Sequence, residues 1–227
     1  MSAARNHERV LVLGGGDGLV ARELLKYDTV QEIIIVDLDP AITELARENR
    51  LLRDANADSM NDPRVTVINA DAYTYVEQSP DLYPVIIADL PDPNNETLSK
   101  LYSREFYTLI QQHLTPDGVF VTQATSPYFV RESFWMIANT VEEVGFNMLP
   151  LHTYVPSFGE WGFVLGGMHT TPRVSVPDGF DLQYLTPEIL RSAQAFAPDI
   201  DRLETDVNTL NNPVLPRVYL NGWNQWN

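Results

Sequence analysis

The chain has 227 residues, and 44% of them are hydrophobic, which is enough for one sizeable core. The absence of cysteine excludes disulfides, thiolate metal sites and a cysteine nucleophile. Fifteen Lys and Arg against 31 Asp and Glu give a formal net charge of -16. That charge excludes nucleic acid as a partner and favours cationic ligands such as polyamines, basic peptides or metal ions. With no secretory leader and no long apolar run, we expect a cytoplasmic location.

Short β-branched runs alternate with amphipathic stretches over the first two thirds of the chain. This pattern predicts an α/β fold, with a mostly parallel sheet covered by helices on both faces. Between Phe146 and Met168 the pattern predicts two more strands, paired as a hairpin, for a total of seven. The other predicted strands lie near Val10–Leu13, Ile33–Val36, Val65–Ile68, Val85–Ala88 and Val119–Thr122, and the predicted helices near Leu19–Lys26, Ala41–Leu52, Tyr102–His113 and Phe129–Val144.

Residues 171–227 differ in composition from the rest, with six prolines among polar residues. We expect residues 1–170 to form one domain and residues 171–227 to be a Pro-rich tail packed on that domain. The tail carries one predicted helix, near Pro187–Ala195.

A glycine-rich turn follows the first predicted strand, with Gly14, Gly15, Gly16 and Gly18 around Asp17. Glycines at the start of a helix let the backbone approach a ligand closely and offer it free N–H groups. Leu19 breaks the G-x-G-x-x-G spacing and Asp17 would repel a pyrophosphate, so the turn disfavours NAD or FAD. A purely structural tight turn is the alternative interpretation.

Acidic residues follow the next two predicted strands. Asp37 lies about 20 residues beyond the glycines, the spacing at which a carboxylate meets a ribose diol. Asp71 follows the third strand, where α/β nucleoside sites hold the exocyclic amine of adenine. The alternatives are helix caps, by Asp71 for the next helix and by Asp39 for the helix that opens at Pro40. Acids at neighbouring strand ends meet at one edge of the sheet, which favours a nucleoside site there.

Two more acids, Asp89 and Asp92, lie on a loop after the fourth predicted strand. Pro91 and Pro93 restrict this loop and discourage helix formation. Paired carboxylates favour a cationic ligand, with Mg²⁺ as the alternative. No histidine-rich or phosphate-binding pattern accompanies them, so we expect no metal.

Taken together, the motifs resemble the spermidine synthase family of aminopropyltransferases over about residues 7–168. The resemblance implies a seven-stranded, methyltransferase-like domain. The stretches at residues 156–163 and 208–213 look like those of bacterial members whose catalytic domain follows a membrane-embedded N-terminal half. That half would be absent from this chain, and the catalytic domain would then lie at the cytoplasmic face of the inner membrane. The motifs are Gly14–Gly18, Val36–Pro40, Asp62–Arg64, Asn69–Ala72, Asp89–Pro93, Tyr102–Tyr107 and Trp161–Phe163.

Enzymes of this family move the aminopropyl group of decarboxylated S-adenosylmethionine, a co-substrate, onto a polyamine acceptor such as putrescine and release methylthioadenosine. The resemblance therefore implies a transferase without a prosthetic group, acting as a homodimer. It makes residues 1–170 the catalytic domain and Asp89 the base. It implies that Asp17 binds the aminopropyl ammonium, while Asp92 and Gln123 hold the acceptor. The donor-binding set is Gly14, Gly16, Asp17, Gly18, Asp37, Asp71 and Ala72.

The chain departs from the family pattern on the acceptor side. Many relatives place a tyrosine where this chain has the run Val155–Gly159, and Tyr154 or Trp161 are the candidate substitutes. Two other functions remain as alternatives. A methyltransferase would use intact S-adenosylmethionine, whose carboxylate Asp17 would repel by about 1–4 kcal/mol at 4 Å. A non-catalytic nucleoside- or polyamine-binding domain would have no need of a base such as Asp89.

Overall fold

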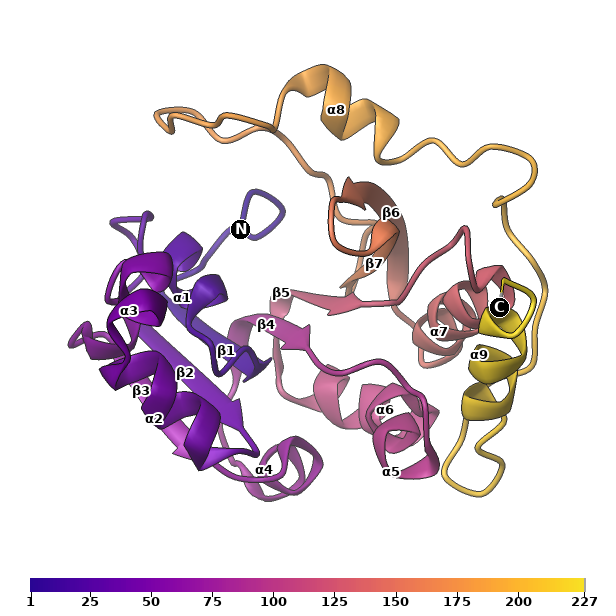
Figure 1. The fold of residues 1–227 in the computed structure, drawn as a ribbon, viewed down its shortest axis with the longest axis horizontal. Helices are drawn as coiled ribbons and strands as arrows, with labels where there is room; N and C mark the ends of the chain where they lie inside the picture. The colour runs from indigo at the N-terminus through magenta and orange to yellow at the C-terminus, as the bar shows by residue number, and fades with distance from the viewer. Residues whose placement is uncertain (227) are drawn as a thin grey trace.

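The computed structural model describes residues 1–226, and Asn227, the last residue of the expected tail, lies outside them. Its centre is a seven-stranded sheet of order β3-β2-β1-β4-β5-β7-β6 (Figure 1). Neighbouring strands are parallel from β3 to β5, and β7 runs antiparallel to β5 and β6. The predicted α/β fold and its C-terminal hairpin are therefore confirmed. The strands are β1 (Arg9–Gly14), β2 (Glu32–Asp37), β3 (Val65–Asn69), β4 (Tyr83–Asp89), β5 (Leu114–Gln123), β6 (Asn147–Val155) and β7 (Gly159–Gly167).

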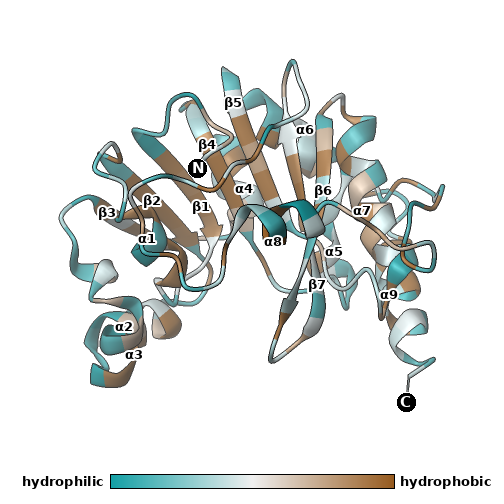
Figure 2. Cartoon of the chain, turned by 90° about the horizontal axis from the view of Figure 1, so that it is seen from above, coloured by the Kyte–Doolittle hydropathy of each residue, from teal (hydrophilic) through white to brown (hydrophobic). Residues whose placement is uncertain are grey.

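The sheet separates two hydrophobic cores, and β1 contributes to both because successive side chains of a strand point to opposite faces. Leu11 and Leu13 pack on one face with α4, α6 and α7, and Val10 and Val12 pack on the other with α1 and α2. Figure 2 shows the apolar strands between these helical layers. The helices are α1 (Leu19–Leu24), α2 (Pro40–Glu48), α3 (Arg50–Asn56), α4 (Ala72–Gln78), α5 (Glu96–Ser99), α6 (Arg104–Gln112), α7 (Arg131–Glu143), α8 (Pro187–Ser192) and α9 (Leu215–Trp223), with short 3-10 turns at Ser59–Asn61 and Lys100–Tyr102.

One helix prediction is wrong: the helix expected over Ala41–Leu52 is two helices, α2 and α3, which meet at Asn49. The backbone of Asn49 is extended, with ψ 124°, and its side chain accepts hydrogen bonds from the N–H groups of Leu51 and Leu52. Asparagine competes in this way with helical backbone bonding and favours caps over helix interiors. The amphipathic pattern runs through the break and therefore concealed it.

The first part of residues 171–226 lies against the N-terminal region and β6: Ser175 donates to Ser2, Phe180 packs on Tyr27, and the N–H of His152 donates to the carbonyl oxygen of Ala193. The segment then passes the outside of α7 and leads to α9, which lies beside α7 (Figure 1). Trp135 donates from Nε1 to the carbonyl oxygen of Ile200 at 2.9 Å, and Asn139 donates to that of Leu203 at 2.9 Å. Helix α8 confirms the helix predicted in this segment, whereas α9 has no predicted counterpart. The sequence pattern also missed the short helices α4 and α5 in the first part of the chain. No helix within residues 1–226 is long and apolar enough to cross a bilayer.

Candidate active site

A cavity of about 430 Å³ opens at the carboxyl edge of β1, β2 and β4, where the chain leaves each strand. Such edges collect side chains from loops that lie far apart in sequence. Four predicted site acids meet here, and the predicted Gly14, Gly16 and Ala72 also line the cavity. The acids are Asp17, Asp37, Asp71 and Asp89.

The glycine turn fits tightly between the second and fourth strands. Gly14 lies opposite Asp89 in the parallel β1–β4 register and has φ +83°. A side chain on Gly16 would collide with Asp37, because a Cβ there would lie 2.6 Å from the carboxylate carbon. Gly18, with φ +79°, opens α1 against Met60. The glycines therefore serve the close packing of the turn as well as leaving room for a ligand.

Both carboxylate oxygens of Asp37 are oriented by backbone N–H groups, that of Gly16 at 2.9 Å and that of Asp39 at 2.9 Å. A carboxylate oxygen has a second acceptor position, so Asp37 keeps acceptor capacity toward the cavity. Asp39 accepts from the N–H of Ala41 at 2.8 Å and caps α2. The cap interpretation of Asp39 is correct, and Asp37 is the acid of this pair that lines the cavity.

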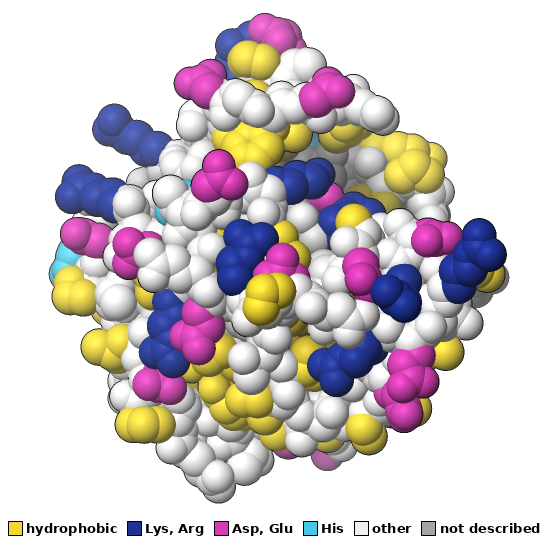
Figure 3. All heavy atoms as spheres, turned by 90° about the vertical axis from the view of Figure 1, so that its left-hand side faces the viewer, with side chains coloured by type: hydrophobic (Ala, Val, Ile, Leu, Met, Phe, Trp, Pro, Cys, Tyr) yellow, Lys and Arg dark blue, Asp and Glu magenta, His cyan; other side chains and the backbone are white. Residues whose placement is uncertain are grey.

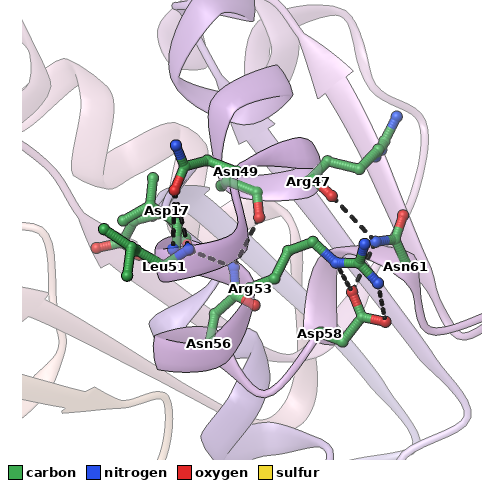
Figure 4. Close-up of polar contacts among 10 residues, drawn as sticks. Asp17, Arg47, Asn49, Leu51, Arg53, Asn56, Asp58 and Asn61 are labelled. Atoms are coloured by element: carbon green, nitrogen blue, oxygen red, sulfur yellow. Dashed lines mark hydrogen bonds and ion pairs between the residues drawn. The ribbon is translucent and has the colours of Figure 1, made fainter.

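Asp17 is exposed, and the turn that carries it is anchored from below by Asn56 of α3 (Figure 4). Asn56 is fully buried and donates to the carbonyl oxygens of Asp17 and Ala46, each at 3.0 Å. The Asp17 side chain accepts from the N–H of Leu19 at 2.9 Å. Asn56 thus ties the glycine turn to α2 and α3, a role that no motif indicated.

Asp71 has two roles in the structure. One oxygen accepts from the N–H of Thr74 at 3.0 Å and caps α4, as the alternative interpretation predicted. The other oxygen lies 2.8 Å from Nζ of Lys100, a residue that also lines the cavity. Burial raises the pKa of Asp71, but the ammonium of Lys100 and the N–H of Thr74 outweigh it, so the pKa is lowered. Lys100 is a cavity residue that sequence reasoning missed.

The environment of Asp89 raises its pKa above the ordinary aspartate value of 3.8. The carboxylate is open to the cavity, but the protein crowded around it removes much of its remaining hydration, and this desolvation is the largest cause. The negative charges of Asp17 and Asp37 raise the pKa further. Asp89 is therefore a stronger base than a free aspartate.

Asp92 and Gln123 form a second cluster beside the cavity. The Gln123 amide is buried and donates to the carbonyl oxygen of Leu90 at 2.8 Å and to Asp92 at 3.2 Å. Its oxygen accepts from the N–H of Thr125 at 3.0 Å. The amide nitrogen of Gln123 thus holds the loop that follows Asp89, and its oxygen is engaged by the backbone of its own segment. Burial raises the pKa of Asp92, and hydrogen bonds from Tyr219 and Gln123 oppose this shift.

The backbone is strained two residues beyond Gln123. Thr125 has φ +58°, an uncommon conformation for a β-branched residue, and costs of order 1–3 kcal/mol. Its side chain is fully buried, and within residues 1–226 its hydroxyl makes no well-formed hydrogen bond, although it lies near enough to Asp92 to favour the charged form. Strain and an unpaired hydroxyl at one place are typical of a ligand site.

The two aromatic candidates lie on the hairpin and do not line the cavity within the described residues. Tyr154 of β6 is 61% exposed, and Trp161 of β7 packs against Phe158 with ring centroids 5.0 Å apart. The cavity wall is apolar at other positions. Leu38 and Ile42 line the cavity and are 71% and 44% exposed, and the buried Leu90 and Leu101 line it as well. Exposed leucine and isoleucine beside a cavity suit the faces of a planar base.

The surface beside the cavity mixes charges of both signs. Figure 3 shows basic and acidic side chains interspersed on the face that carries α2 and α3. Ion pairs on this side of the sheet include Lys26–Glu23 at 2.6 Å and Arg53–Asp58 at 2.8 Å. In the part of the chain that the structure describes, no group of three or more His, Asp or Glu side chains is arranged to hold a metal ion.

The strand order and the glycine turn define an α/β domain with a methyltransferase-like fold, whose acid-lined cavity lies at the carboxyl edge of the sheet. Residues 1–177 match the spermine/spermidine synthase domain, and the chain belongs to that family. It is 42% identical over 230 residues to a polyamine aminopropyltransferase of Oceanobacillus iheyensis, covering 100% of this chain and 45% of the relative. It is 43% identical over 219 residues to a polyamine aminopropyltransferase of Leptospira interrogans, covering 96% of this chain and 44% of that relative. The chain thus spans about half the length of the curated relatives it matches.

Solved structures agree with this assignment. A spermidine synthase in complex with the transition-state analogue AdoDATO has a TM-score of 0.77 and 26% identity, covering 86% of this chain and 69% of that chain. The spermidine synthase of Thermotoga maritima has a TM-score of 0.76 and 25% identity, covering 86% and 68%. The predicted fold and family are therefore confirmed.

Proposed function

We propose that this protein transfers the aminopropyl group of decarboxylated S-adenosylmethionine to a polyamine acceptor of the putrescine class and releases methylthioadenosine. One observation carries the proposal: Asp17, Asp37 and Asp89 converge on one cavity, where the first two raise the pKa of the third. Such a site attracts a ligand with several positive charges, and the donor and the amine both carry them. The names of the relatives and the analogue bound to the solved neighbour support this chemistry.

The cavity suits the nucleoside part of the donor. In the proposed pose Asp37 accepts from the ribose hydroxyls and Asp71 from the adenine amine, with Leu38 and Ile42 packed on the base. Gly14 and Gly16 bring the backbone close to the ligand, and Ala72, at the first turn of α4, leaves room beside Asp71. Gly18 does not line the cavity, and its proposed part in donor binding is to shape the turn that opens α1. A nucleoside that binds Asp71 would compete with Lys100 for that carboxylate.

Asp89 is the proposed base. The amine nitrogen attacks the carbon next to the sulfonium, the C–S bond breaks, and its electron pair stays on sulfur to give the neutral thioether of methylthioadenosine. The nitrogen gives up one proton to the Asp89 carboxylate. An alkylamine is protonated at neutral pH, with a pKa near 10, so a base with a raised pKa beside the attack site makes it a nucleophile. Alignment of the two substrates supplies the rest of the acceleration.

On the acceptor side, Asp92 is the proposed anchor for the distal ammonium, and Gln123 acts by holding Asp92 and the loop. Tyr154 and Trp161 stay proposals for the hairpin wall of the acceptor channel.

We also propose that residues 1–170 are the catalytic domain and residues 171–227 a tail that supports it. A homodimer, and a membrane-embedded N-terminal half in the whole protein with the catalytic domain on the cytoplasmic side, are further proposals. Light scattering of the purified chain tests whether it forms a homodimer. Membrane fractionation of the whole protein tests for the membrane-embedded half.

The competing function is methyl transfer from intact S-adenosylmethionine. The intact donor carries a carboxylate where the decarboxylated donor has only its ammonium end. Asp17 at the cavity mouth repels that carboxylate and attracts the ammonium. The charge of this one side chain favours the decarboxylated donor.

The deciding experiment incubates the protein with each donor and a panel of amines: putrescine, cadaverine, agmatine and spermidine. Mass spectrometry then measures methylthioadenosine and the aminopropylated amine. We expect both products, in equal amounts, from the decarboxylated donor alone. S-adenosylhomocysteine from the intact donor would replace the proposal with methyl transfer. Calorimetric binding of methylthioadenosine without turnover of any amine would replace it with a binding function.

A further inference from the structure

The C-terminal helix reaches the loop that carries the proposed acceptor anchor. In α9, Leu215, Tyr219 and Trp223 follow a spacing of four residues, and Leu215 and Tyr219 are buried. The helix packs beside α7 and α5 (Figure 1). From this position the Tyr219 hydroxyl donates a hydrogen bond of 2.7 Å to Oδ2 of Asp92, 127 residues away in sequence.

Asp92 is thereby held on both oxygens. Oδ1 accepts from Gln123 at 3.2 Å and Oδ2 accepts from Tyr219 at 2.7 Å. One donor comes from the end of β5 and the other from the tail, so the carboxylate has a fixed orientation. Each oxygen retains a further acceptor position, which leaves the carboxylate able to bind an ammonium group.

The tail is fixed to this region by a buried polar anchor. Asn208 has no exposed surface, and its amide donates to the carbonyl oxygens of Ser99 at 3.0 Å and Tyr102 at 3.1 Å. Its side-chain oxygen accepts from the N–H of Leu215 at 3.3 Å, the first residue of α9. Tyr102 in turn donates to the carbonyl oxygen of Pro91 at 2.9 Å, next to Asp92. The start of α9 and the Asp92 loop are therefore connected through one hydrogen-bond network.

We propose that Tyr219 is a positioning residue of the acceptor site: it acts through Asp92, and it makes the C-terminal tail part of the amine-binding half of the enzyme. The inference deepens the proposed function and rests on it for the identity of the ligand, an alkylammonium. A carboxylate that anchors an ammonium has to be ionised and correctly aimed, and the phenol hydrogen bond favours both.

The local electrostatics agree with this role. Burial raises the pKa of Asp92, and the hydrogen bond from Tyr219 is the largest opposing effect. The titratable groups that face Asp92 are Tyr219 of α9 and Tyr102 of the 3-10 turn, and both phenols have pKa values raised by burial. They stay protonated through the neutral range, so Tyr219 remains a donor there.

The test compares Tyr219→Phe with Tyr184→Phe in the full chain. Tyr184 also lies in the tail, and its hydroxyl makes a hydrogen bond, at 3.0 Å to Thr153, away from Asp92. We expect Tyr219→Phe to raise KM for putrescine about tenfold, since a hydrogen bond to a charged group has this effect on binding. Affinity for methylthioadenosine and kcat should stay within about threefold, because the base and the donor cavity are untouched. Tyr184→Phe should match the parent in all three, and thermal unfolding verifies that both variants fold.

Two further measurements separate positioning from a packing defect. In an Asp92→Asn background, Tyr219→Phe should have no additional effect on amine affinity, because its partner charge is gone. Carboxyl ¹³C NMR of the parent and of Tyr219→Phe should show the pKa of Asp92 rising by about one pH unit in the variant. An unchanged KM for putrescine together with an unchanged Asp92 titration overturns the inference. It is also overturned if Tyr219→Phe weakens amine affinity as much in the Asp92→Asn background as in the parent.

Failure of the proposed function remains distinguishable from failure of this inference. If the parent protein transfers no aminopropyl group, calorimetry with putrescine in the presence of methylthioadenosine replaces the kinetic assay. A tenfold weaker amine affinity in Tyr219→Phe then supports the role of Tyr219 without turnover. Equal amine affinity in the parent and the variant refutes it.

Discussion

Gly14 and Asp89 lie opposite each other where β1 and β4 end, so closely that a Cβ on Gly14 would lie 1.9 Å from the Asp89 carbonyl oxygen. This contact places the glycine turn directly against the proposed base. It also explains why residue 14 has no side chain.

Gly14→Ala should therefore destabilise the protein by more than about 3 kcal/mol, because it adds a backbone collision to the strain of a positive φ. Gly179→Ala is the matched control, since Gly179 has the same φ of +83° and nothing within 4 Å of the added carbon. The control should cost about 1 kcal/mol, a fall of about 2–4 °C in Tm. Thermal unfolding of both variants measures the difference in stability. Equal losses of stability would mean that β1 and β4 move apart at little cost to accommodate the added carbon.

Asp89→Asn should lower kcat by about 10²–10⁴ while affinity for methylthioadenosine stays near that of the parent. The substitution removes the proposed base and keeps the shape of the side chain. Asp117→Asn, at the opposite edge of the sheet on β5, is the control and should turn over normally. Turnover of Asp89→Asn within a few-fold of the parent would assign the base to another residue.

The acid limb of the pH–rate profile should lie above the range of an ordinary aspartate. A base acts only when ionised, so activity is lost as pH falls through the pKa of Asp89, which is raised by desolvation and then by Asp17 and Asp37. Asp17→Asn removes one of these charges and should move the acid limb to lower pH. A profile of kcat/KM for both proteins tests this, and a limb that moves upward contradicts it.

Asp17→Asn should also reduce the preference for the decarboxylated donor over the intact one, because the carboxylate of the intact donor loses its opposing charge. The change should be about five- to a hundredfold in the affinity ratio, within the 1–4 kcal/mol range for a surface pair. Calorimetry with both donors gives the ratio directly. If the affinity ratio does not change, the charge of Asp17 does not determine which donor the protein prefers.

Asp37→Asn should weaken methylthioadenosine binding about tenfold or more, because the amide offers one acceptor oxygen where the carboxylate offers two. Asp39→Asn is the control: Asp39 caps α2 two residues away, and asparagine caps about as well. Equal effects of the two substitutions on nucleoside affinity would show that the α2 turn, and not the Asp37 carboxylate, governs binding.

The sequence was most informative where chemistry follows directly from topology. Parallel strands end at one edge, so the sequence alone predicts that the acids after β1, β2, β3 and β4 lie together. The break at Asn49 escaped because a cap and a helix interior share the same amphipathic pattern. Lys100 and Tyr219 escaped for another reason: each meets its partner across a long stretch of chain, 29 residues to Asp71 and 127 to Asp92. No local periodicity encodes such a contact.

The separation of Tyr219 from Asp92 bears on the order in which the site can form during synthesis. Within residues 1–226, every residue that lines the cavity lies between Gly14 and Leu101, so the ribosome delivers the proposed nucleoside half early. Tyr219 emerges more than a hundred residues later, and chains are made at about 5–20 residues per second. For several seconds a nascent chain holds all these cavity residues while Asp92 lacks its phenol partner. Docking of α9 then adds the hydrogen bond from Tyr219 to Asp92, so the proposed amine-binding half of the site is completed later than the cavity.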